Sequence, residues 1–141
     1  MRSRIAAATA LLALATAGTA TAANRHYTGD FKHSDAVIAL DVVVQKGKPK
    51  QVDAVAYDDV PVNCSNTGEG TIGPGEYNFL AAPVKHRAFQ AHDGSTTLHN
   101  SFSVSGRFSR DGRQASGQFQ YTYESSGQQC ATPILAWSAK R

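Results

Sequence analysis

The chain has 141 residues, and the 119 that follow a leader of 22 suit one small domain with a single core, so we expect no second domain. It carries 14 Lys and Arg against 11 Asp and Glu, for a formal net charge of +3. We assign Arg2 and Arg4 to an N-terminal leader; without them twelve basic residues face eleven acidic ones, and the net charge is +1. A charge so close to zero gives no support to a nucleic-acid-binding function.

The first 22 residues have the features of a secretory signal peptide. Arg2 and Arg4 precede an uncharged run rich in Ala and Leu, which closes on small residues up to Ala22. This run is too short and too rich in Ala to span a membrane, and no second apolar run follows it. We therefore predict a leader over residues 1–22, an exported single domain over residues 23–141 and no membrane span.

The first segment after the leader with a clear pattern predicts two β-strands. Apolar residues recur at every second position over residues 36–45 and 51–57, which is the period of a strand. Pairing Val44 with Val52 gives one apolar face and places Val55 on the other, more polar face. Residues 60–84, rich in Gly and Pro, predict a long loop.

The two cysteines, Cys64 and Cys130, both lie in the exported part, where we expect them to form a disulfide. Such a bridge closes a loop of about 67 residues, for which the chain-entropy model gives a stabilisation of about 4 kcal/mol. Neither cysteine has another Cys or a His at the roughly two-to-four-residue spacing of zinc ligands. A cysteine nucleophile would require a free thiolate, which the expected bridge rules out.

A further strand is expected over residues 85–91, with Asp93 and Gly94 turning the chain. A hairpin then follows over residues 102–121, because Asp111 and Gly112 are a preferred pair for a two-residue hairpin turn. In this register all apolar side chains fall on one face, and Ser, Gln and Arg fall on the other, so the hairpin is half buried.

The predicted hairpin places Gly106 opposite Gly117 and so leaves bare backbone in the middle of the apolar face. Such a gap is normally filled by a large side chain from the opposing layer, since protein interiors are close-packed. Our candidate is Trp137, on a terminal strand over residues 134–140. Together these elements predict an all-β fold, an antiparallel β-sandwich of about seven strands with one disulfide.

No motif in the chain identifies a catalytic residue, a cofactor or a metal. Residues 68–73 match G-x-G-x-x-G, but no buried parallel strand precedes them and no helix is expected to follow, as a nucleotide site requires. No Ser lies in a G-x-S-x-G turn, and no pair of carboxylates stands out. A three-His metal site from His86, His92 and His99 is not required by their spacing. We predict no cofactor and no metal.

Three arginines gather about the predicted hairpin tip: Arg107, Arg110 and Arg113. They are our candidate binding residues, because the guanidinium group matches phosphate and carboxylate groups. The expected partner is an anionic polymer of the cell envelope or another extracellular protein, and not a nucleic acid. The alternative is that these charges keep exposed turns and edges soluble and block strand addition.

The exported part resembles the small secreted all-β proteins of actinobacteria. The resemblance rests on Cys64, GRF at 106–108, ASGQF at 115–119, Cys130 and WSAKR at 137–141, and it covers mainly the second half of the chain. It implies a two-cysteine β-sandwich and brings no catalytic residue with it.

These observations predict a secreted bacterial protein that acts as a non-catalytic extracellular binding or envelope-associated module. The alternative is a small extracellular hydrolase, which would bring a His and a carboxylate into one pocket. A binding module would instead expose an Arg patch or aromatic side chains, and the tyrosines to inspect are Tyr27, Tyr57, Tyr77 and Tyr123.

Overall fold

The computed structural model describes residues 21–78, 80–95 and 99–141, so almost all of the predicted leader lies outside the described residues. The described part contains no helix, and hence none long and apolar enough to cross a membrane. Its strands are β1 (Ala23–Phe31), β2 (Val37–Gln45), β3 (Lys48–Asp58), β4 (Val60–Cys64), β5 (Gly68–Ile72), β6 (Gly75–Tyr77), β7 (Ala82–Pro83), β8 (Ala88–Ser95), β9 (Asn100–Phe108), β10 (Gln114–Ser125), β11 (Gln128–Ala131) and β12 (Leu135–Lys140).

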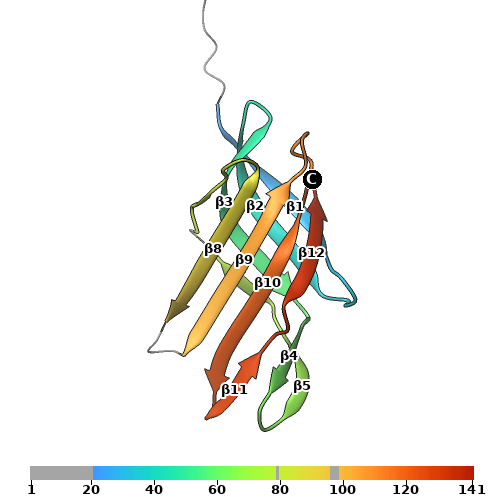
Figure 1. Cartoon of the computed structure of the whole chain (residues 1–141), viewed down its shortest axis with the longest axis vertical. Coiled ribbons are helices and arrows are strands. Elements are labelled where there is room, and N and C mark those ends of the chain that lie inside the picture. Colours follow the sequence, from blue (N-terminus) through green and yellow to red (C-terminus); the bar gives the residue numbers. More distant parts are fainter. Residues whose placement is uncertain (1–20, 79, 96–98) are drawn as a thin grey trace, which may run out of the picture.

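The twelve strands form one antiparallel sheet that folds over on itself into two layers (Figure 1). Strands β8, β9 and β10 lie in front of β1, β2 and β3, and β12 joins the layers because it pairs with β10 on one side and β1 on the other. Phe31, Phe102 and Phe119 lie in the core between the layers. The predicted all-β, antiparallel, disulfide-bonded class is confirmed, whereas the predicted count of about seven strands is too low.

The predicted register of the β9–β10 hairpin is confirmed. Gly106 pairs with Gly117, and Val104 pairs with Phe119. The tip is wider than a two-residue turn, because the Ser109 N–H donates to the Gln114 carbonyl over 2.9 Å and leaves residues 110–113 in the loop. Gly112 adopts a φ of +66°, a backbone conformation that favours glycine.

The predicted register of β2 with β3 is wrong. Val44 pairs with Pro49 rather than Val52, and the pairing shifts between Asp41 and Val42 and again between Val43 and Val44. These irregularities change which side chains face inward. Val55, predicted on the polar face, is fully buried in the core.

Trp137 fills the gap above the glycine pair, as predicted, but it comes from a neighbouring strand and not from the opposing layer. It lies on β12 and pairs with Gly117. A Cβ atom on Gly106 would lie 2.7 Å from both the Trp137 and the Phe89 rings. The indole therefore occupies the space above the glycines, where it is completely buried.

The segment predicted as a long loop instead contains four short strands. Strands β4 and β5 form a hairpin, and β4 continues the sheet by pairing with β11 (Figure 1). Strands β6 and β7 pair with β3. We call β4, β5 and β11 the arm.

The predicted turn at Asp93 and Gly94 is also wrong, because both residues belong to strand β8.

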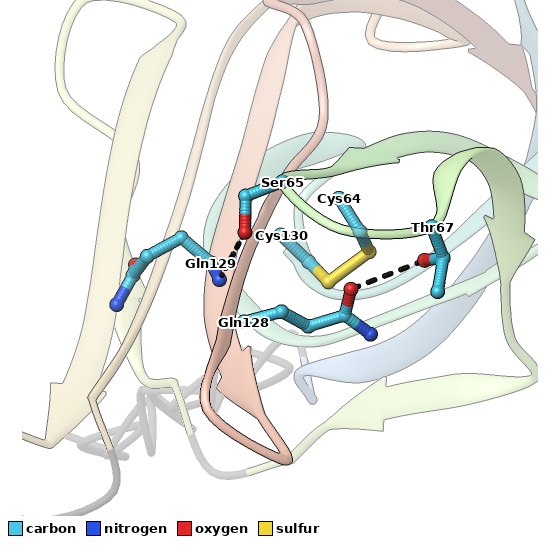
Figure 2. Close-up of a disulfide and its surroundings, with 6 residues drawn as sticks. All are labelled: Cys64, Ser65, Thr67, Gln128, Gln129 and Cys130. Atoms are coloured by element: carbon cyan, nitrogen blue, oxygen red, sulfur yellow. Dashed lines mark hydrogen bonds between the residues drawn. A yellow bond between two sulfur atoms is a disulfide. The ribbon is translucent and has the colours of Figure 1, made fainter.

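The predicted disulfide is present and holds the arm together (Figure 2). Cys64 and Cys130 are paired residues of β4 and β11, with their Cα atoms 4.0 Å apart. The Thr67 hydroxyl donates to the Gln128 side chain over 3.1 Å beside the bridge. The bridge thus fixes the β4–β5 hairpin to the end of the β10–β11 hairpin.

Candidate functional site

The three candidate arginines lie at the tip of the β9–β10 hairpin. Arg110 and Arg113 stand in the turn, Arg107 is next to the last residue of β9, and all three are exposed. The Arg107 guanidinium donates to the His86 carbonyl over 3.1 Å, and the Arg113 carbonyl accepts from the Arg141 N–H over 3.1 Å. The tip therefore contacts both the β7–β8 connection and the last residue of the chain.

This tip is fixed in place by a buried tyrosine. The Tyr27 hydroxyl donates to the Gly112 carbonyl over 2.5 Å, and Tyr27 itself is fully buried. A Cβ atom on Gly112 would lie 2.9 Å from Pro49 and 3.1 Å from the Gly47 carbonyl. The β9–β10 turn and the β2–β3 turn are therefore packed against each other.

Charges at this end act on the Tyr27 hydroxyl. Burial raises its pKa, and the nearby Asp111 carboxylate also raises it, whereas Arg141 and Arg25 lower it. The Arg141 guanidinium lies 5.9 Å from the centre of the Tyr27 ring. Strand β1 thus brings Arg25 to the same end of the molecule as the hairpin tip.

Two further segments bring basic residues to this end. Lys46 lies in the β2–β3 turn, and Lys50 accepts the Val84 N–H at its carbonyl over 2.8 Å. Arg87, in the β7–β8 connection, donates to the Phe108 carbonyl over 3.4 Å. The β2–β3 turn, the β7–β8 connection and the β9–β10 turn all lie at the upper end of the molecule in Figure 1, and the C-terminus lies at the same end.

Of the twelve Lys and Arg residues in the described part of the chain, all but Lys32 belong to this end, and all are exposed. We call it the basic end. Its cationic residues are Arg25, Lys46, Lys48, Lys50, Lys85, Arg87, Arg107, Arg110, Arg113, Lys140 and Arg141.

The carboxylates are concentrated at the opposite end, which also contains the arm and Lys32. We call it the acidic end. Asp41 and Asp53 lie along strands between the two ends, and Asp111 lies in the β9–β10 turn. The remaining carboxylates form the acidic end: Asp30, Asp35, Asp58, Asp59, Glu69, Glu76, Asp93 and Glu124. Strands of nine residues, such as β1 and β9, separate the ends by about 30 Å.

The opposite charges do not neutralise each other within the molecule. Among the described residues, carboxylates form ion pairs only with histidines, in His26–Asp41 at 2.7 Å and His99–Glu124 at 3.7 Å. The carboxylate at the basic end belongs to Asp111. It accepts hydrogen bonds from the Ser109 hydroxyl and the Arg113 N–H, and both lower the pKa of Asp111. No cationic side chain of the basic end therefore forms an ion pair with a carboxylate of the described residues, and only Arg113 acts through its charge on the Asp111 carboxylate.

Of the four tyrosines named above as candidates for an exposed aromatic surface, two are buried and two are half-buried. The buried ones are Tyr27 and Tyr57, and the half-buried ones, Tyr77 and Tyr123, pack against core residues. Tyr57 lies against Phe119, and Tyr77 stacks on Phe102 at 4.0 Å. Burial, together with Tyr121 and Tyr123, raises the pKa of Tyr57 to about 12. Burial and a hydrogen bond with Tyr121 also raise the pKa of Tyr77. None of the four tyrosines is fully exposed, and only Tyr77 and Tyr123 keep part of their surface accessible to solvent.

The grooves of the molecule do not join a His to a carboxylate. A groove across the strands contains no His. Its lining includes both carboxylates and cationic residues: Asp30, Asp58, Glu76, Arg87, Arg107 and Lys140. A smaller groove contains His92 but no carboxylate. Within the described residues, no three His, Cys, Asp or Glu side chains are placed to hold a metal ion. The G-x-G-x-x-G stretch forms β5 and the residue after it.

The structure thus brings together the three arginines that the sequence singled out and adds eight more cationic residues from other segments. The signal that sequence reasoning missed is that the basic residues recur in turns at one end of an antiparallel chain. Comparison with known proteins finds no matching family, no similar curated protein and no similar solved structure.

Proposed function

We propose that the protein is a secreted, non-catalytic binding module that attaches to an anionic polymer of the bacterial envelope through its basic end. The observation that carries this proposal is the concentration of eleven exposed cationic side chains at one end, none of them paired with a carboxylate. The surface is formed by the β2–β3 turn, the β9–β10 turn, the β7–β8 connection, the start of β1 and the end of β12.

The distribution of these charges favours a polymer over a small molecule. Only Arg87, Arg107 and Lys140 share a groove, and the other eight cationic residues of the basic end line neither groove. A ligand must therefore carry repeated charges to meet most of them. Guanidinium groups match phosphate and carboxylate groups equally well in geometry. Each exposed contact is weak and screened by salt, so the affinity has to come from many contacts and must fall steeply with ionic strength.

The test is retention on two immobilised polymers, linear polyphosphate and polygalacturonate, which distinguish phosphate from carboxylate recognition. We expect the exported protein to bind one or both at low salt and to elute as salt rises. The variant R107A/R110A/R113A should elute at lower salt, with the slope of log affinity against log salt reduced by about one per lost contact.

The chain offers a matched control in R110A and K32A, which each remove one exposed cation from opposite ends of the molecule. R110A should weaken retention and K32A should leave it unchanged. Equal retention of the triple variant and the original protein, or equal loss in R110A and K32A, would refute the proposal. Circular dichroism establishes that every variant is folded.

A further inference from the structure

We infer that copies of this protein associate end to end, with the basic end of one copy against the acidic end of the next. The inference shares the basic end with the proposed function, but it also requires the acidic end, which binding to an anionic polymer does not use. The partner is therefore a second copy of this chain.

The first argument is charge complementarity. The basic end carries eleven cationic residues and one carboxylate, and the acidic end carries eight carboxylates and one cationic residue, Lys32. Asp58 is partly buried, and every other charged side chain in these two groups is exposed. Among the described residues no Lys or Arg is paired with a carboxylate, and Glu124 is the one member of the acidic end that contacts a histidine. Contacts between copies would therefore not have to break a pair between a Lys or Arg and a carboxylate.

The second argument is the low net charge. Twelve cationic and eleven acidic residues in the described part leave +1, so two copies approach one another with almost no overall repulsion. The attraction between opposite ends is then the largest electrostatic term. Ionic strength controls it, because the Debye length falls from about 30 Å at 0.01 M to about 8 Å at 0.15 M.

The geometry points to chains rather than closed dimers. The basic residues Lys46, Arg110 and Arg113 stand in turns beyond the strand ends, and Asp35 and Asp59 stand in turns at the opposite end. A contact between two different surfaces of the same protein leaves one free surface of each kind at the ends of the assembly. Further copies can therefore be added at both ends.

The experiment compares two Lys→Glu variants that have the same net charge. Lys48, at the basic end, and Lys32, at the acidic end, are both exposed. The mass of the exported protein is measured by sedimentation velocity at about 0.01 M and about 0.15 M salt. At low salt we expect the mass of the original protein to exceed that of a dimer, and at high salt we expect it to return to that of the monomer.

The two variants should change the low-salt mass in opposite directions. K48E weakens the basic end and should lower the mass, whereas K32E strengthens the acidic end and should raise it. Equal effects of the two variants, a monomeric original protein at low salt, or an assembly that stops at the dimer would overturn the inference.

The same variants separate this inference from the proposed function. At dilutions where both proteins are monomeric, K32E should bind polyphosphate or polygalacturonate as well as the original protein does, and at higher concentration it should associate more strongly with itself. If neither polymer is bound but the opposite effects on mass are seen, the proposed function fails and the inference stands. If K48E loses polymer binding and neither variant changes the low-salt mass, the proposed function stands and the inference fails.

Discussion

Two glycines allow adjacent strands to approach more closely than any residue with a side chain would permit. A Cβ atom on Gly29 would lie 1.8 Å from the Ser138 carbonyl oxygen, and one on Gly117 would lie 1.8 Å from that of Ser105. In both cases the obstacle is backbone, which cannot move aside as a flexible side chain does. Gly29 lies in the pairing of β1 with β12, where the sheet passes from one layer to the other.

The substitution G117A should therefore lower the free energy of unfolding by about 3 kcal/mol, because the paired strands must separate to admit the methyl group. G70A is the matched control, since the nearest atom to its Cβ would be a Val62 methyl at 4.0 Å. We expect G70A to change the stability by less than about 1 kcal/mol. Denaturant unfolding measures both values, and equal losses would contradict this account of Gly117.

Tyr57 should make the protein less stable at alkaline pH. Its pKa rises from 10.0 to about 12 in the folded protein, mainly through burial. Between these two values the unfolded chain has released a proton that the folded protein still holds, so stability is intact below pH 10 and falls as pH rises towards 12. Y57F should show a shallower fall over this range in denaturant unfolding. Identical slopes for both proteins would contradict the assignment to Tyr57.

At the scale of elements, the sequence predicts strands well where both faces have a clear pattern. The β9–β10 register follows from strict alternation, because a slip by one residue would expose Val104 and Phe119. Strand β3 contains Ala54 and Val55 in succession, both buried, and this irregularity cannot be read from a period of two. Strand β5 has no buried residue to reveal it, so its glycine-rich sequence was interpreted as a loop.

The arm should depend on its disulfide more than the rest of the fold does. Strands β4 and β11 share only two residue pairs, Cys64 with Cys130 and Asn63 with Ala131. Replacing both cysteines with serine should lower the free energy of unfolding by about 4 kcal/mol, because the bridge spans 66 positions of sequence.

Hydrogen exchange locates the effect of this double substitution. Amides of β4 and β5 should lose more protection than those of β9 and β10, whose hairpin has eight residue pairs of its own. Uniform loss across both hairpins would show that the bridge stabilises the fold as a whole and not the arm in particular.

At the scale of the whole molecule, the separation of charge was not predictable from composition. A net charge near zero is compatible with any arrangement of the same residues. The distribution of charge can be predicted only when each turn is assigned to one end of the molecule. That assignment requires the correct number of strands between successive turns. The sequence of residues 60–84 predicts a loop, which does not relate the turns before that segment to those after it. The sequence alone therefore groups only Arg107, Arg110 and Arg113.

A protein with separated charges should bind to ion exchangers of both kinds. At pH 7 and low salt we expect retention on a cation exchanger through the basic end and on an anion exchanger through the acidic end, despite a net charge of only +1 over the described residues. R110A/R113A should shorten retention on the cation exchanger only, and D35N/E69N on the anion exchanger only. Exclusion from either resin by the original protein would contradict the observed polarity.

The burial of Trp137 also gives the protein an internal optical probe. It is the one tryptophan of the chain, its side chain is inaccessible to solvent, and its indole N–H contacts no acceptor among the described residues. Its fluorescence should therefore be emitted at short wavelength in the native state and shift to the red when water reaches the ring. Since the indole covers Gly106 and Gly117, a single emission spectrum reports whether β9, β10 and β12 are still joined.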